Sequence, residues 1–256
     1  MDPPSQLTEP VTEPLSAPLK APTLPGSPQH GWRRYEYQIA WYGLTSICAL
    51  IDVVCFVALG GVFASMMTGN LLLLAVSVGS GSGWIDVGRQ ALPIAMFAVG
   101  AVLGARLMRT SDLLPKRMQS WRLGFALEWL FLVCATVLAW RMDSTELNAT
   151  SQMIVTLLGL SMGVHGAMVR GHGVPDLGSN VMTTILATLM ADTRIAKGDS
   201  KHWQRRSVSI CVFFVAGIMG ALLLKVGSMA VPLSVACLIL TAALYSLMTA
   251  TPPSRD

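Results

Sequence analysis

Charged residues are scarce in this sequence. They make up 12% of its 256 residues, against about 25% in an average soluble domain, whereas hydrophobic residues make up 53%. The apolar residues gather in runs such as 39–60 and 210–224, and a helix needs about 20 such residues to cross a bilayer. This composition excludes a water-soluble fold. It indicates a membrane protein with several spanning segments, whose main partner is the lipid bilayer.

Cysteine is also sparse, and the sequence lacks the spacings that metal sites and disulfide frameworks use. The five cysteines lie in apolar segments and form no C-x-x-C pair: Cys48, Cys55, Cys134, Cys211 and Cys237. The glycine-rich phosphate loop of an ATPase is absent. A Gly-x-Ser-x-Gly match at 159–163 lies in a predicted membrane helix, where a nucleophile elbow cannot form. We therefore expect no metal, no cofactor and no catalytic residue, and hence no enzyme.

The net charge of +4 does not indicate nucleic-acid binding, because the basic residues lie in short loops between apolar segments. Two of these loops, 106–122 and 192–206, each hold five Lys or Arg residues. The loop around Asp143 and Glu146 is slightly acidic. By the positive-inside rule, both basic loops and both termini are predicted to be cytoplasmic.

Composition also divides the chain into tails and membrane segments. Eight prolines fall within the first 30 residues, so we expect a disordered cytoplasmic tail over 1–36. Eight apolar segments follow, at 38–60, 62–78, 90–107, 123–140, 153–169, 177–190, 208–224 and 230–249. A short C-terminal tail covers 250–256.

The second and sixth segments differ from the rest because each is broken or short. Thr68-Gly69-Asn70 interrupts the second, and the sixth has only 14 residues. If all eight segments crossed, the N-terminal tail would lie opposite the first basic loop. If these two are re-entrant, every basic segment lies on one side. We therefore predict an all-α integral membrane fold with six full transmembrane helices and two short broken or re-entrant helices.

The two unusual segments occupy the same place in two halves of the chain, 37–140 and 153–249. This pattern predicts an internal duplication into two membrane repeats. An odd number of crossings in each half would make the second repeat inverted relative to the first.

Three ionisable residues lie inside predicted membrane segments: Asp52, Glu128 and His165. A carboxylate near the centre of a membrane helix costs about 3 kcal/mol on insertion scales, so it should face a cavity or a partner. Asp52 is either a buried carboxyl that locks helices together or a proton or cation acceptor. Glu128 is either such an acid or an interfacial partner of Arg122. His165 is either a packing residue or a proton relay.

The broken segments carry polar residues where their helices are expected to begin. In the first half these are Thr68, Gly69 and Asn70, with Asn70 as the expected helix cap. In the second half they are Asp176, Ser179 and Asn180. An inverted duplication would bring both helix ends near the midplane, where their N–H groups favour a small polar or anionic solute. The alternative is a capped turn at the membrane surface.

Small residues recur four apart at matching places in the two halves, as Gly100 and Gly104 and as Gly217 and Ala221. Such faces let helices approach closely, so we interpret both as packing surfaces. The same faces would join two copies of the chain in a homo-oligomer.

The stretch from Asp52 to Met67-Thr68-Gly69-Asn70 resembles the YoaK family of bacterial multi-pass membrane proteins, a family of unknown function. The resemblance rests on an acidic residue in the first helix, a Leu-Gly-x-x-Phe stretch and the Met-Thr-Gly-Asn tetrapeptide. Val174-Pro175-Asp176 resembles a second-half motif, whereas His165-Gly166 differs from the Gln-Asn pair expected there. Membership implies a bacterial inner-membrane protein with a role in transport.

The duplication, the broken segments and the intramembrane carboxylates together predict a secondary transporter or channel. Its solute is expected to be small and polar or anionic, with protons as the coupling ion if one of the carboxyls titrates. The alternative is a membrane-embedded scaffold or an enzyme of unknown activity.

Overall fold

The computed structural model describes residues 31–110, 120–142, 148–172, 182–196 and 203–249. Within these ranges the chain forms helices and no strand, so the predicted all-α class is confirmed. The elements are α1 (Gly31–Ala58), α2 (Met67–Gly79), α3 (Trp84–Thr110), α4 (Ser120–Trp140), α5 (Ala149–His172), α6 (Met182–Ala191), the 3-10 helix η4 (Arg194–Ala196), α7 (Trp203–Val226) and α8 (Ala230–Thr249).

Six of these helices, α1, α3, α4, α5, α7 and α8, are long and apolar enough to cross a membrane. The other two are apolar but short, with 13 residues in α2 and 10 in α6. At 1.5 Å per residue they reach about 20 and 15 Å, well short of a hydrocarbon core of about 30 Å. The predicted set of six long and two short membrane helices is therefore confirmed, and the chain is a multi-pass membrane protein.

The break before α2 lies earlier than the sequence analysis expected. Thr68, Gly69 and Asn70 belong to the first turn of α2, and the non-helical connection covers 59–66. Gly60 and Gly61 in this connection have φ angles of 93° and 73°, a region that glycine enters without steric cost. The predicted cap is also wrong, since Met66 holds the N-cap position without a side-chain capping bond.

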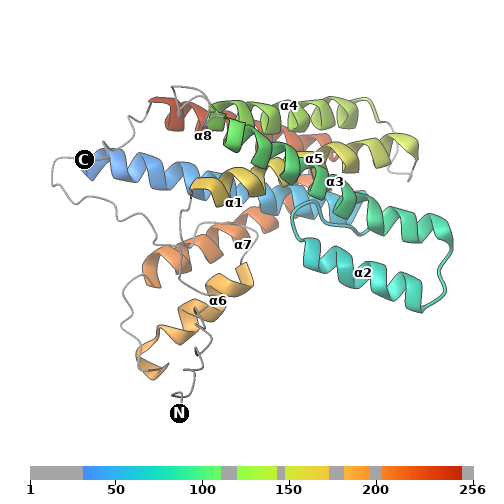
Figure 1. Ribbon diagram of the computed structural model, residues 1–256, viewed down its shortest axis with the longest axis horizontal. Helices are drawn as coiled ribbons and strands as arrows, with labels where there is room; N and C mark the ends of the chain where they lie inside the picture. Colours follow the sequence, from blue (N-terminus) through green and yellow to red (C-terminus); the bar gives the residue numbers. More distant parts are fainter. Residues whose placement is uncertain (1–30, 111–119, 143–147, 173–181, 197–202, 250–256) are drawn as a thin grey trace, which may run out of the picture.

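The two central helices are α1 and α5. Their membrane segments are 67% and 61% buried, against 17% for those of α3 and α7. Around them, α1 packs against α7 and α8, α5 packs against α3 and α4, and α4 meets α8. The short helices lie outside this group, with α2 beside α3 and α6 beside α7 (Figure 1).

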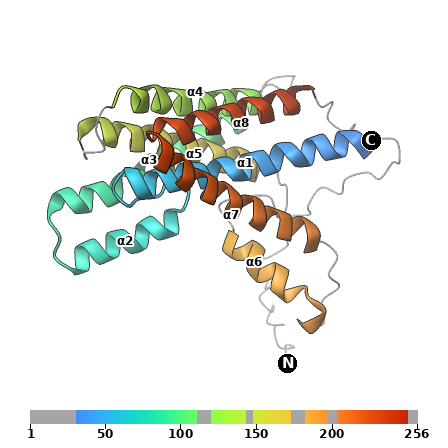
Figure 2. The ribbon, with the colours of Figure 1, turned by 180° about the vertical axis from the view of Figure 1, so that it is seen from behind.

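The long helices alternate in direction along the chain. Followed by colour in Figures 1 and 2, α1, α4 and α7 run toward the end of the bundle where α2 lies, and α3, α5 and α8 run back. The start of α1 therefore lies at the same end as the last turns of α3, α5 and α8. The start of α4, which follows the first basic loop, lies at this end as well (Figure 1).

The glycines of α3 allow it to lie directly against α5. A Cβ atom on Gly100 would stand 2.3 Å from the carbonyl oxygen of Leu160, and one on Gly104 would stand 2.8 Å from the Cβ of Ala167. This confirms a packing role for the first small-residue face. Because α5 of the same chain occupies that face, the expectation that Gly100 and Gly104 join two copies of the chain is wrong.

The corresponding face of α7 is looser. A Cβ on Gly217 would have its nearest neighbour, Val53 of α1, at 3.9 Å, whereas Gly220 lies closer, with Leu50 at 3.3 Å. Homo-oligomerisation stays a prediction, and it requires a surface other than the one that α5 covers.

Candidate functional site

Asp52 is buried in α1 and holds the connection between α1 and α2. The backbone N–H groups of Ala64 and Ser65 each donate to its Oδ1 at 2.8 Å. The Ser65 hydroxyl donates to Oδ2 at 2.5 Å. Both carboxyl oxygens are therefore used within the chain, as expected for a carboxyl that locks structure together.

Asn70 fixes the same connection from the other side. Its Oδ1 accepts a hydrogen bond from the Phe63 N–H at 2.8 Å, and its Nδ2 donates to the Phe63 carbonyl at 2.6 Å. The Phe63 ring stacks on Phe56, with ring centroids 5.1 Å apart. It also lies against Gly69, where a Cβ would stand 3.0 Å from the ring. Asn70 thus binds the Phe63 backbone, and the absence of a side chain on Gly69 leaves room for the Phe63 ring.

These bonds change the expectation for an anion site at this helix. The predicted site relied on backbone N–H groups at the start of α2. Asp52 accepts hydrogen bonds from two backbone N–H groups, those of Ala64 and Ser65, in the connection just before that start. The Asn70 side chain is likewise engaged by Phe63, and Thr68 points to the surface. In this half of the chain, an acidic side chain of the protein itself therefore binds the segment that leads into α2.

A second polar group lies deeper in the bundle, where Glu128 of α4 meets His165 of α5. The His165 Nδ1 and the Glu128 Oε1 are 2.9 Å apart, and both side chains are almost wholly buried. The second carboxyl oxygen, Oε2, is buried and has no hydrogen-bond partner among the described residues. Glu128 is thus buried within the helix bundle, where its side chain faces His165.

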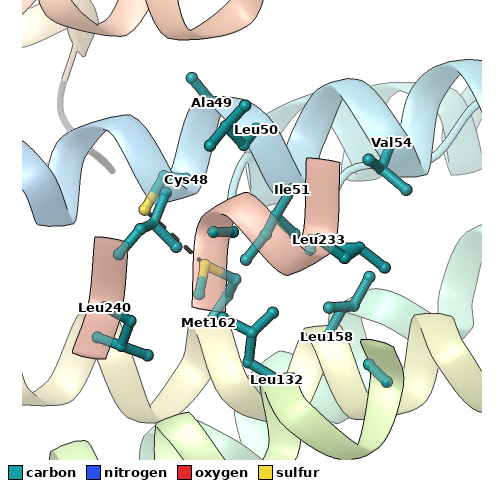
Figure 3. Close-up of a cluster of buried hydrophobic side chains, with 14 of the residues drawn as sticks. Cys48, Ala49, Leu50, Ile51, Val54, Leu132, Leu158, Met162, Leu233 and Leu240 are labelled. Atoms are coloured by element: carbon teal, nitrogen blue, oxygen red, sulfur yellow. Dashed lines mark hydrogen bonds between the residues drawn. The ribbon is translucent and has the colours of Figure 1, made fainter. Parts of the chain in front are cut away.

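Three further residues complete this buried cluster. The Cys48 Sγ of α1 lies 3.6 Å from the His165 Nε2 and 3.8 Å from the Met162 Sδ. Figure 3 shows the two sulfur atoms facing each other across the α1–α5 contact. The Ser161 hydroxyl donates to the Glu128 carbonyl at 3.0 Å.

Sequence reasoning missed Cys48, Ser161 and Met162 as members of this cluster. Cys48 precedes Asp52 by four residues, which places both on one face of α1. Ser161 precedes His165 by the same interval on α5. These spacings can be read from the sequence, but the contact between α1 and α5 cannot.

Asp176, Ser179 and Asn180 fall outside the described residues, so their expected approach to Asn70 stays a prediction. Within the described ranges, no group of three or more His, Cys, Asp or Glu side chains is arranged to hold a metal ion.

The short helix α6 is tied to α7 by an arginine. Arg206 of α7 forms an ion pair with Asp192, just after the end of α6, and its Nη1 lies 3.5 Å from the Thr188 carbonyl oxygen. A cation is favourable at this end of a helix, where the backbone carbonyls carry partial negative charge.

Comparison with known proteins gives a family but no activity. Residues 40–246 match the family described as "Protein of unknown function (DUF1275)". The chain is similar to the UPF0700 transmembrane protein YoaK of Bacillus subtilis (strain 168), with 25% identity over 182 residues, covering 68% of this chain and 77% of that protein. No solved structure gives a significant match.

Proposed function

Starting from the fact that this chain belongs to the DUF1275 family, whose function is unknown, we propose that it is a proton-coupled secondary transporter for small polar solutes. The observation that carries the proposal is the buried pair of Glu128 and His165. Ionisable groups inside membrane segments are costly and typically mark ion or substrate pathways. This pair lies between two spanning helices in the centre of the bundle.

The pair has the chemistry of a proton site. His165 holds one oxygen of the Glu128 carboxyl in place, and the other oxygen retains lone pairs that can accept a proton. Protonation would neutralise the carboxyl and change its attraction to the imidazole. A change of this kind, at a contact between α4 and α5, couples proton occupancy to helix packing.

The helix packing supports the predicted inverted duplication and, with it, a transport role. Exchange of α1–α4 with α5–α8 leaves the packing pattern unchanged: the partners of α1 are α7 and α8, and those of α5 are α3 and α4. The equivalent helices also run in opposite directions (Figure 1). Inverted repeats with short helices beside the spanning ones are typical of secondary transporters. We therefore assign residues 37–140 and 153–249 to two repeats, with α2 and α6 as re-entrant helices.

The proposed solute class depends on which hydrogen-bond donors in the first repeat are free to bind a solute. Asp52 already accepts the backbone N–H groups of Ala64 and Ser65, just before α2, so these two groups are not available to bind an anion. An anionic preference rests on the second repeat, on Ser179 and Asn180. We propose the cytoplasmic membrane of a bacterium as the location, with both termini inside, since the relative is a bacterial transmembrane protein.

Reconstitution into liposomes with a trapped pH-sensitive dye tests the proposal. Pools of amino acids, carboxylic acids, sugars and nucleosides are added outside, and at least one pool is expected to change the internal pH. Glu128→Gln should abolish the response because the amide cannot take up the proton. The matched control is Asp86→Asn, which removes an exposed carboxyl paired with Arg89 and should leave the response intact.

Two outcomes would contradict the proposal. If no pool moves protons, the protein is better regarded as a membrane scaffold or an enzyme. If Glu128→Gln responds like the unmodified protein, the coupling site lies elsewhere.

A further inference from the structure

The buried sulfur and nitrogen atoms of Cys48, Met162 and His165 form a group that a proton relay does not require. We propose that these three side chains bind a soft monovalent metal ion, Cu(I) or its chemical analogue Ag(I). The site is contributed by α1 and α5, and Figure 3 shows Cys48 and Met162 directed toward each other within the apolar core. The proposal does not depend on transport.

The two distances from the Cys48 sulfur suit ligands that share one metal ion. Metal–sulfur and metal–nitrogen bonds are about 2.3 and 2.0 Å long in protein sites. For tetrahedral to trigonal angles, such bonds place two sulfur ligands about 3.8–4.0 Å apart and a sulfur and a nitrogen about 3.5–3.7 Å apart. The Cys48 Sγ lies 3.8 Å from the Met162 Sδ and 3.6 Å from the His165 Nε2. Met162 and His165 are three residues apart on α5, so they share a helix face.

The ligand types select the ion. Thiolate and thioether sulfur are soft ligands that favour Cu(I), whereas Mg²⁺ and Ca²⁺ require oxygen. A thioether is neutral, and so is imidazole, so the Cys48 thiolate is the single charge in the first coordination shell. It cancels the charge of a monovalent ion, which suits a site surrounded by Leu and Ile side chains.

Glu128 supplies the outer shell that metal-binding histidines usually have. Metal-ligating histidines commonly donate their other ring N–H to a carboxylate, which fixes the tautomer and orients the ring. Here the His165 Nδ1 faces the Glu128 Oε1 at 2.9 Å. This leaves the Nε2 lone pair directed toward Cys48. Binding replaces the Cys48 thiol proton with the metal, and that proton is released to the solvent.

The test is metal binding by the purified full chain in detergent. Cu(I), kept reduced with ascorbate, is titrated in competition with a coloured Cu(I) chelator, and Ag(I) is added in separate thermal unfolding scans. We expect one tightly bound Cu(I) per chain and a higher melting temperature with Ag(I). X-ray absorption should show two sulfur ligands and one nitrogen ligand.

Substitutions separate the site from the other sulfur atoms, since the chain has five cysteines and 15 methionines. Cys48→Ser should weaken Cu(I) binding by about 100-fold or more because a hard oxygen replaces the thiolate. Glu128→Gln should weaken it by roughly 10- to 100-fold through the outer shell. Cys134→Ser and Cys211→Ser remove exposed thiols and should bind as the unmodified chain does.

The variant Met162→Leu distinguishes loss of metal binding from loss of folding. Leu has nearly the volume of Met, so packing is retained and the metal-free melting temperature should stay close to that of the unmodified chain. The rise with Ag(I) should nevertheless be lost. Equal Cu(I) affinity in Cys48→Ser and the unmodified chain would overturn the proposal. Displacement of Cu(I) by an equal concentration of Zn(II) would overturn the choice of a soft monovalent ion.

Discussion

At the scale of single residues, Asp52 illustrates how a carboxyl group is accommodated inside a membrane helix. Burial of an unpaired carboxylate is costly, but here three donors converge on it, all from the connection to α2. Hydrogen bonds to a charged acceptor are stronger than those between neutral groups. The Asp52 carboxyl group therefore takes the place that a bound anion would occupy at these donors.

Asp52→Ala is predicted to destabilise the protein more than Asp52→Asn. Alanine leaves two buried backbone N–H groups and the Ser65 hydroxyl without an acceptor, at about 1–3 kcal/mol for each unsatisfied donor. Asparagine keeps an oxygen for the two N–H groups. The measurement is the apparent melting temperature in detergent at a fixed scan rate.

Ser65→Ala is the matched control for Asp52, because it removes only the hydroxyl bond and should cost about 1 kcal/mol. An unchanged melting temperature in Asp52→Ala would contradict the role of Asp52 in holding the connection. The alternative role of Asp52, as a proton or cation acceptor, would then be favoured.

The sequence alone was sufficient to predict which ionisable residues lie in apolar segments. It was not sufficient to predict their contact partners, because these come from distant parts of the chain. The intramembrane position of Asp52, Glu128 and His165 could be predicted from apolar runs. Their partners could not, because Cys48 and His165 are 117 residues apart. The Gly60-Gly61 pair was the available signal for the true start of α2, since adjacent glycines favour a turn.

At the scale of elements, the two short helices are held by polar ties rather than by apolar packing alone. Asn70 binds the connection before α2, and Arg206 of α7 binds the end of α6. A helix of 10 to 13 residues is marginal on its own. Fixed ends compensate for this, and they position the short helices against α3 and α7.

The two small-residue faces predict opposite responses to an added methyl group. Gly100→Ala places a Cβ 2.3 Å from the Leu160 carbonyl oxygen, so α3 must move from α5 at a cost of about 1–3 kcal/mol. Gly217→Ala has its nearest neighbour at 3.9 Å, and alanine favours a helix over glycine by roughly 1 kcal/mol. Melting temperatures should therefore fall for Gly100→Ala and stay equal or rise for Gly217→Ala. A similar fall in both variants would contradict this difference, because it would show that Gly217 has as little space beside α1 as Gly100 has beside α5.

At the scale of the whole molecule, the six long and two short helices were predictable because bilayer thickness imposes the length of each span. The pairing of α1 with α7 and α8, and of α5 with α3 and α4, was not predictable. Apolar segments in a membrane have no hydrophobic reason to choose one neighbour over another, so small residues and shape decide.

The number of crossings gives the last prediction, which concerns orientation in the membrane. With six crossings, two precede Lys116, three precede Glu146 and four precede Lys201, so a reporter at Lys116 and one at Lys201 lie on the same side. With eight crossings, α2 and α6 also span, and these two reporters lie on opposite sides. The positive-inside rule makes the shared side cytoplasmic. The measurement uses truncations after each residue, fused to an enzyme active on only one side of the membrane. We expect cytoplasmic activity at Lys116 and Lys201 and external activity at Glu146, whereas opposite results at the two lysines would exclude re-entrant short helices and an inverted pair of three-crossing repeats.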